Sequence, residues 1–422
     1  MFFISILISF LLNINLSNIF GPFINNEELL EYNINAKNGG AVSDLTSHWR
    51  YINLLKKDLS NLISSQLGVD TYAKLINFPL HHIIFSQLSF LKDINHYLLF
   101  FFIFSLFVPI IFYKSLQSHF SNNKLLLIFL SSLIYLFPAF QYSAIWGNNH
   151  ITALFFFCIG IYFYNEFKYK NKKKNFNLYS AITFFSLTCY TKQFYVFFFI
   201  FLIFDLLRYL KLKNYLILSI FTFALAVPGI IFTYKNPLLF FGLTQKTTNF
   251  TSSIIVSSSI IFFYLAPFII QYFFNLENDI KNRLYSLIDK KIIIFSLIIS
   301  IIGIYTFEYN SHIGGGIFYK FSLIEFDNLT FFFLTSFLGI YFIFFFTKKE
   351  LASLILTILL LITFSSGYFI FQKYFEPMFY IIFLNFFDKN KIINSIKDKN
   401  YIVIIYFSIY YLILNYTYFS GL

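Results

Sequence analysis

Charged residues are scarce in this chain of 422 residues, and their scarcity decides its class. Only 12% of the residues are Asp, Glu, Lys or Arg, whereas a soluble domain carries about 25%. The apolar fraction is 58%, and apolar runs of roughly the 20 residues that cross a bilayer as a helix recur along the chain. The composition excludes an ordinary soluble domain and predicts an all-α polytopic membrane protein, because backbone groups in lipid must be hydrogen-bonded internally.

Cysteine and recognisable catalytic motifs are also scarce. The two cysteines, Cys158 and Cys189, lie in or at the end of apolar runs and lack metal-ligand spacing, so we expect no disulfide. The chain has no P-loop, dinucleotide fingerprint, HExxH or Gly-x-Ser-x-Gly motif. No low-complexity tail or repeat of solenoid length is present. The function must therefore be inferred from topology and from the placement of the few polar residues.

Hydrophobic runs predict about 13 transmembrane helices, with boundaries uncertain by a few residues. They cover 2–19, 96–113, 125–145, 151–165, 178–190, 193–207, 214–233, 253–274, 292–307, 329–347, 351–366, 368–387 and 401–418. The first run lacks a preceding Lys or Arg and a small-residue cleavage site, so we expect a retained anchor. Residues 1–422 are thus expected to form one transmembrane domain, with 20–95 as its long first outer loop.

The basic residues indicate the orientation. With the amino terminus in the cytoplasm, most of the 31 Lys and Arg residues fall in short inner loops, as the positive-inside rule expects. These loops include 168–174, 281–291 and 389–399. The net charge of +12 is therefore explained by topology and by contact with anionic lipid headgroups, and we expect no nucleic-acid partner.

The first outer loop contains a helical pattern. Apolar residues recur at spacings of three and four at Leu45, Trp49, Ile52, Leu55, Leu59 and Leu62, which is typical of one face of an amphipathic helix. We expect a helix over 44–65 that lies flat on the outer membrane surface, apolar face down. Ser43 or Asp44 would begin it, and capping alone could account for the acid.

The second half of this loop holds paired histidines after a turn. The stretch "NFPLHHII" at 77–84 places Pro79 before His81 and His82, and proline fixes the backbone just before the next amphipathic segment. All but one of the seven histidines fall on the outer side by this topology, the exception being His119. This asymmetry favours a polar site at the outer face.

Four features together resemble the GT-C superfamily of glycosyltransferases, which use polyprenyl-phosphate-linked sugars. They are Asp44 shortly after the first span, "NFPLHH" at 77–82, the broken run "CYTKQFYV" at 189–196 and "QKYFEPMFYIIF" at 372–383. Within this superfamily the chain resembles the dolichyl-phosphate-glucose glucosyltransferase, protein mannosyltransferase and aminoarabinose transferase branches. It implies that Asp44 is the catalytic acidic residue of the first outer loop.

The implied reaction is an inverting, single-displacement transfer of a sugar. Asp44 would take the proton of an acceptor hydroxyl as general base, and cations near the outer face would bind the donor phosphate, because charges at the membrane boundary are costly and usually functional. The expected substrate-binding residues are His48, Arg50, His81, His82, Lys192, His312, Gly314, Gly315, Lys320 and Lys373. The sequence predicts no metal ligands and leaves open whether a divalent metal takes part.

Simpler interpretations of several of these residues stay open. Lys192 could be an interfacial lysine that snorkels, and Lys373 could form a local ion pair with Glu376. The glycine run beginning at Gly314 could form an anion-binding concavity of backbone N–H groups or a flexible connector.

Other classes of function also stay open. A polysaccharide polymerase or ligase usually has its large outer loop late in the chain, and a lipid-linked oligosaccharide flippase or transporter would favour inverted repeats. We expect a multi-pass protein of a bacterial inner membrane with its site facing the periplasm. Its partners would be the polyprenyl-phosphate-linked sugar, membrane lipids and a lipid-linked glycan, lipid or protein acceptor.

Overall fold

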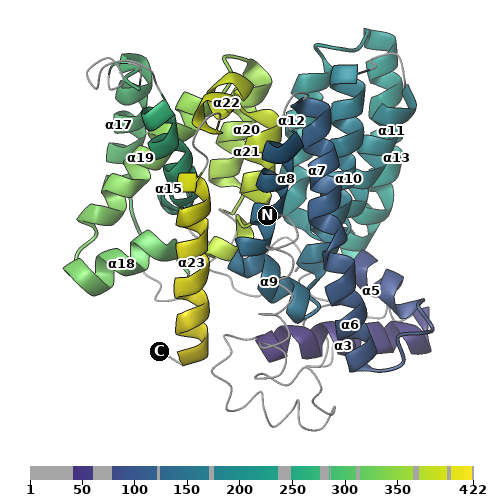
Figure 1. Cartoon of the computed structure of the whole chain (residues 1–422). Helices are drawn as coiled ribbons and strands as arrows, with labels where there is room; N and C mark the ends of the chain where they lie inside the picture. The colour runs from purple at the N-terminus through teal and green to yellow at the C-terminus, as the bar shows by residue number, and fades with distance from the viewer. Residues whose placement is uncertain are drawn as a thin grey trace. The chain divides into compact units, whose positions relative to one another are not determined.

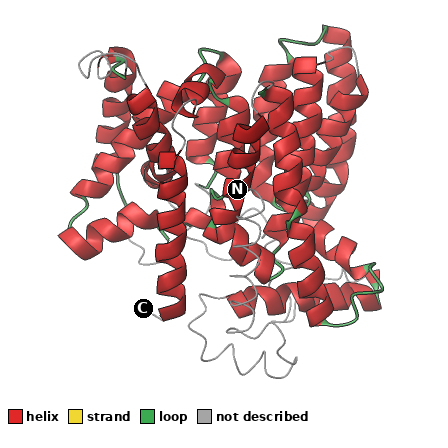
Figure 2. Cartoon of the chain, in the orientation of Figure 1, coloured by secondary structure: helices red, strands yellow, loops and turns green. Residues whose placement is uncertain are grey.

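The computed structural model describes most of the chain, and every regular element in the described stretches is a helix (Figure 2). These stretches are 41–59, 78–120, 124–170, 175–235, 249–275, 285, 287–309, 314–364, 370–396 and 401–420, with side chains described except at 41–43 and 415–420. The prediction of an all-α protein is confirmed for this part of the chain. The first expected span, 2–19, lies outside the described residues.

The chain forms two compact units. The first contains residues 1–196, 210–243 and 410–422, and the second contains 197–209 and 244–409. The helices of the first unit are α3 (Ala41–Lys57), α5 (Leu80–Ser86), α6 (Ile94–Ser105), α7 (Phe107–His119), α8 (Lys124–Ser132), η3 (Leu133–Leu136), α9 (Pro138–Ile145), α10 (Asn149–Asn165), η4 (Glu166–Lys170), α11 (Asn175–Cys189), η5 (Gln193–Val196) and α13 (Leu212–Lys235).

In the first unit α10 packs closely against both α7 and α11. Its buried face carries large apolar side chains, and Phe157 packs against Phe185 of α11. Gly160 lets the two helices approach, because a Cβ at this position would lie 2.7 Å from the Phe185 ring. Cys158 and Cys189 are both free and buried, so the expected absence of a disulfide is confirmed.

The second unit is arranged around α15 (Phe250–Asn275), which packs against α17 (Lys290–Tyr305), α18 (Gly316–Phe326), α19 (Thr330–Phe346), α20 (Leu351–Ile362) and α22 (Lys389–Ile396). The other described helices of this unit are α12 (Phe197–Leu206), η6 (Gln372–Tyr374) and α21 (Met378–Phe386). The C-terminal helix α23 (Tyr401–Ser420) is divided between the two units at residue 409.

Several helices are long and apolar enough to cross a membrane. Among the described residues they are Ile94–His119, Asn149–Lys170, Leu212–Lys235 and Phe250–Asn275. Lys124–Leu136 and Pro138–Ile145 together are also long and apolar enough, with a bend of 65° between them. The remaining apolar helices are shorter, as in α19 and α20. The structure therefore has four or five candidate spans in the part it describes, fewer than the 13 expected.

The expected span 368–387 shows why apolar runs overstate helix length. In its described part, 370–387, the helical segments are the short Gln372–Tyr374 and α21 of nine residues. Pro377 precedes α21, and a proline disfavours helical backbone at the residue before it. A buried segment is apolar whether or not it forms one continuous helix, so hydropathy alone does not show this interruption.

The expected amphipathic helix of the first loop is α3. It runs across the lower ends of the other helices of its unit (Figure 1). Leu45, Trp49, Ile52 and Leu55 are all at most 4% exposed, so the predicted apolar face is confirmed for these four positions. The helix ends at Lys57, and Leu59 beyond it is 49% exposed, while Leu62 lies outside the described residues.

Candidate functional site

Three buried histidines meet where α3 packs against α5. His48 comes from α3, and the consecutive His81 and His82 come from α5. One ring nitrogen of each lies within 4.8 Å of the others, and His48 Nδ1 is 2.8 Å from His82 Nε2. We call these three residues the histidine cluster. The sequence predicted each as a substrate-binding residue but not that the pair would meet His48.

His81 is held by hydrogen bonds that fix its tautomer. The Tyr97 hydroxyl donates to the Gly147 carbonyl, so it must accept the N–H of His81 Nε2 at 3.0 Å. Nδ1 of His81 therefore carries the lone pair and accepts from the Thr152 hydroxyl at 2.9 Å. Gly147 has a φ of +60° and lies against the Tyr97 ring, a backbone position that favours glycine.

Helix α5 is positioned by its first residues. Leu80 donates its N–H to the Tyr190 carbonyl at 3.2 Å, and Phe78 packs against the rings of Tyr190 and Phe232. Pro79 stands at the N-cap with helical backbone angles, as its ring prefers. The "NFPL" turn thus fixes the start of α5, and with it the direction in which His81 and His82 project.

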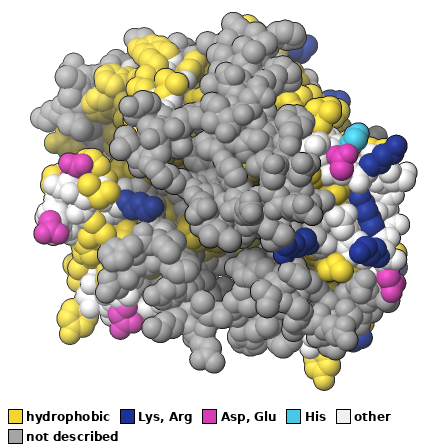
Figure 3. All heavy atoms as spheres, turned by 90° about the horizontal axis from the view of Figure 1, so that it is seen from below, with side chains coloured by type: hydrophobic (Ala, Val, Ile, Leu, Met, Phe, Trp, Pro, Cys, Tyr) yellow, Lys and Arg dark blue, Asp and Glu magenta, His cyan; other side chains and the backbone are white. Residues whose placement is uncertain are grey.

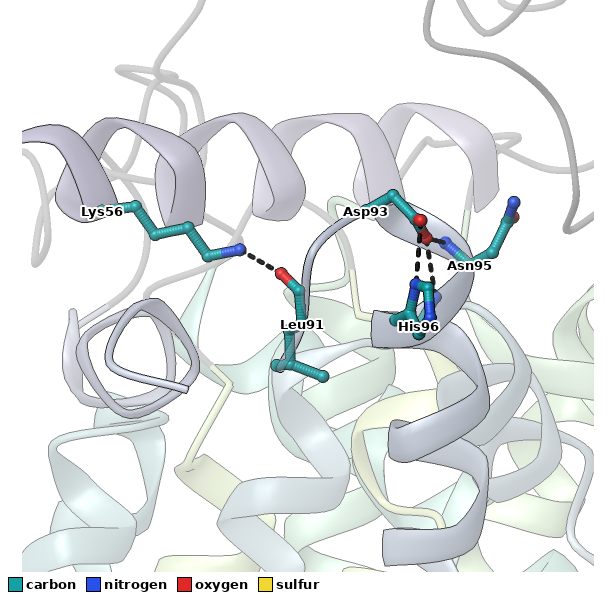
Figure 4. A network of polar contacts seen from close by, with 5 residues as sticks. All are labelled: Lys56, Leu91, Asp93, Asn95 and His96. Atoms are coloured by element: carbon teal, nitrogen blue, oxygen red, sulfur yellow. Dashed lines mark hydrogen bonds and ion pairs between the residues drawn. The ribbon is translucent and has the colours of Figure 1, made fainter. Parts of the chain in front are cut away.

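Helix α3 is fixed at its far end by the network in Figure 4. Lys56 donates to the Leu91 carbonyl at 2.5 Å, and its ammonium lies 4.7 Å from the Trp49 ring centroid. Asp93 caps α6 by accepting the N–H groups of Asn95 and His96 at 2.9 Å each. Figure 3 shows a histidine, acidic and basic side chains gathered at one edge of the face seen from below.

The histidine cluster is held in its neutral form. Burial lowers the pKa of His48 from 6.5 to about 4, a shift that the Asp44 carboxylate opposes and the Lys192 ammonium reinforces. Burial also lowers the pKa values of His81 and His82 well below the usual range, and the neighbouring imidazoles and Lys192 act in the same direction. At neutral pH each ring therefore offers one lone pair and one N–H.

Asp44 lies next to this cluster inside the first turn of α3. The Tyr142 hydroxyl of α9 donates to Asp44 Oδ2 at 3.1 Å. Residues 41–43, which precede Asp44, are already helical, so the expectation that Ser43 or Asp44 begins the helix is wrong, and a simple capping role does not account for the acid. Tyr142, far away in sequence, was not predicted, because only the bend before α9 brings it to Asp44.

Lys192 lies in the turn after α11, where its N–H donates to the Thr188 carbonyl at 2.9 Å. Asn149, at the first position of α10, donates its side-chain N–H to the Thr191 carbonyl at 3.4 Å. Burial is the main cause of the low pKa values of the three histidines, and the Lys192 ammonium lowers them further. Arg50 lies two residues after His48 on α3 and is partly exposed.

No family model matches this chain, and no curated protein or solved structure is significantly similar to it.

The other expected site residues belong to the second unit or lie outside the described residues, as His312 does. Gly314 and Gly315 have φ values of +87° and +78°. Gly315 donates its N–H to the Ile370 carbonyl at 2.9 Å, so that amide is already used within the protein instead of facing an anion. Lys320 on α18 is exposed.

Lys373 and Glu376 differ in their surroundings, although they are one turn apart in sequence. Lys373 is exposed, with its ammonium 5.4 Å from the Phe371 ring centroid. Glu376 is only 2% exposed and accepts a hydrogen bond from the Tyr264 hydroxyl at 2.9 Å. Sequence reasoning missed this buried acid, since a glutamate beside a lysine in sequence resembles a surface pair.

Proposed function

We propose that this chain is a membrane glycosyltransferase that moves a sugar from a polyprenyl-phosphate donor to an acceptor hydroxyl at the outer membrane face. The observation that supports the proposal is an acid, Asp44, held by the Tyr142 hydroxyl on the helix that carries His48. The cation Lys192 lies in the turn after α11 of the same unit, which also holds long apolar helices. A carboxylate beside a cation is the minimum that transfer from a lipid phosphate requires.

In this proposal each group has one task. Asp44 takes the proton of the acceptor hydroxyl, whose oxygen attacks the anomeric carbon of the sugar. The bond from that carbon to the phosphate oxygen breaks, configuration inverts, and the leaving phosphate takes the electron pair. Lys192 stabilises the negative charge of that phosphate. Tyr142, which donates to Asp44 Oδ2, orients the carboxylate.

The test is donor turnover by purified protein in liposomes. We expect polyprenyl phosphate to be released from a polyprenyl-phosphate-hexose donor when an acceptor glycolipid fraction is supplied. Lys192→Gln should lower the rate by about 10²-fold, the loss seen when one charge-stabilising donor is removed. Lys57→Gln is the matched control, because Lys57 is an exposed lysine on α3.

Two results would argue against this function. One is equal turnover by the Lys192 and Lys57 variants, which would remove the cation from the mechanism. The other is an absence of release from pentose and hexose donors alike by protein that is folded in detergent. A lipid-linked glycan carried across the liposome membrane intact would indicate a transporter instead.

A further inference from the structure

We propose that the histidine cluster of His48, His81 and His82 is a binding site for one divalent transition-metal ion, with zinc as the expected metal. The inference does not rest on the proposed function, because it concerns binding by this chain without any sugar donor. Three imidazoles with a fourth position left open is the ligand set of many zinc sites.

The spacing of the ring nitrogens fits a metal ion. In a tetrahedral site with Zn–N bonds of 2.0–2.1 Å, ligand nitrogens lie about 3.3 Å apart. The ligand atoms of the cluster lie within 4.8 Å of one another, so each needs to move by about 1.5 Å or less, which side-chain rotation supplies.

The hydrogen bonds around the cluster leave a specific deficit. His82 is fully buried, and its Nδ1 has no hydrogen-bond partner among the described residues. A buried polar group without a partner costs about 1–3 kcal/mol. Three imidazoles packed side by side, one of them incompletely bonded, are costly without a ligand, and a metal ion gives their lone pairs a common partner.

The surroundings already resemble the outer shell of a metal site. His81 directs its Nε2 N–H at the Tyr97 hydroxyl, which is itself bonded to Gly147. Metal-bound histidines usually donate their second N–H in this way, which fixes the ring and raises its basicity. The Nδ1 lone pair, now bonded to Thr152, is then the donor that turns to the metal.

All three rings are buried, and a neutral imidazole is the form that binds a transition metal. Of the charged groups beside the cluster, the Asp44 carboxylate favours a cation and the Lys192 ammonium disfavours one. Imidazole ligands suit zinc, copper or nickel, whereas magnesium and calcium require oxygen ligands.

The first experiment measures metal content in the full chain, purified in detergent with an affinity tag that contains no histidine. After incubation with Zn²⁺ and dialysis, we expect one zinc ion per chain. His82→Asn should lower the content at least about 10-fold, the lower limit for loss of even a supporting residue. His96→Ala is the matched control, because His96 is an exposed histidine of the same unit.

A second experiment does not depend on whether a variant folds. In the unaltered protein, a chelator should lower the unfolding temperature, and Zn²⁺ but not Mg²⁺ should restore it. Co²⁺ should give the visible absorption of a tetrahedral nitrogen site. Tyr97→Phe should weaken zinc affinity by about 10–100-fold, because it removes the partner of His81 Nε2.

The proposal is overturned if the unaltered protein contains much less than one zinc ion per chain and its unfolding temperature changes with neither chelator nor zinc. It is also overturned if the His82 variant, shown to be folded, retains as much zinc as the His96 variant. Neither result bears on sugar transfer, which is measured separately with Lys192→Gln.

Discussion

At the scale of single residues, a substitution of Asp44 can distinguish a catalytic role from a structural one. Its carboxylate accepts a hydrogen bond from Tyr142, and an asparagine amide oxygen accepts the same bond. Only the carboxylate can take a proton. Asp44→Asn should therefore leave the unfolding temperature close to that of the parent while sugar transfer falls at least about 10²-fold, the lower end of a general-base contribution.

Transfer from a purified lipid-linked donor pool measures this effect. Asp58→Asn is the control, because Asp58 is an exposed acid just after α3. Full activity in the Asp44 variant would leave the acid with a structural role alone.

The buried His48 ring predicts how the stability of the folded protein depends on pH. Its pKa is about 4 in the folded protein against an ordinary value of 6.5, so the unfolded chain binds the extra proton between these values. The free energy of unfolding is therefore unaffected by this ring above pH 6.5, and it decreases as the pH falls from 6.5 toward 4. The difference corresponds to about 3 kcal/mol.

Thermal unfolding of chelator-treated protein between pH 7 and pH 4 measures this loss. We expect the unfolding temperature to fall across the window, and to fall less in His48→Gln, which has no group to titrate. An identical decline in both proteins would show that other groups set the pH dependence.

At the scale of helices, the close contact of α15 with α19 depends on small residues. A Cβ at Gly339 would lie 1.9 Å from the carbonyl oxygen of Ser258. Ser336 donates to the Ile255 carbonyl, and Ser259 bonds with Thr335, both at 2.9 Å. In a membrane, small residues let helix backbones approach closely, and side-chain hydrogen bonds across the contact add to the packing.

Gly339→Ala should consequently force α15 and α19 apart. The expected destabilisation is about 1–3 kcal/mol or more, the usual cost of overpacking, because the clash is with backbone that cannot rotate away. Thermal unfolding in detergent measures it.

Ser219→Ala on the exposed face of α13 is the control and should change stability by less than about 0.5 kcal/mol. An unfolding temperature for Gly339→Ala that matches this control would mean that the helices tolerate a wider separation.

At the scale of the whole molecule, loop charge predicts the orientation in the membrane. The lysines at 168–174 should lie in the cytoplasm. A reporter fused after Lys174 should then be labelled inside, and one fused after Gly315 outside. The reverse labelling would place the histidine cluster and Asp44 on the cytoplasmic side and exclude a donor at the outer face.

The sequence by itself determined those features that depend on neighbours along the chain. Apolar runs predicted helices at most of the expected places, and spacings of three and four predicted α3 with the buried face of Trp49, Ile52 and Leu55. These signals are local, because residues one turn apart share a face of a helix whatever it packs against. The same locality explains why helix lengths, as in 368–387, were not predicted.

Only the tertiary structure decided how the site is assembled. His48 meets His82 across 34 positions and Asp44 meets Tyr142 across 98, distances over which hydropathy and periodicity carry no information. The contacts depend on where Pro79 starts α5 and on the bend before α9, since these set the direction of each side chain. The sequence thus supplied the histidines and the acid, and packing placed three imidazoles around one point.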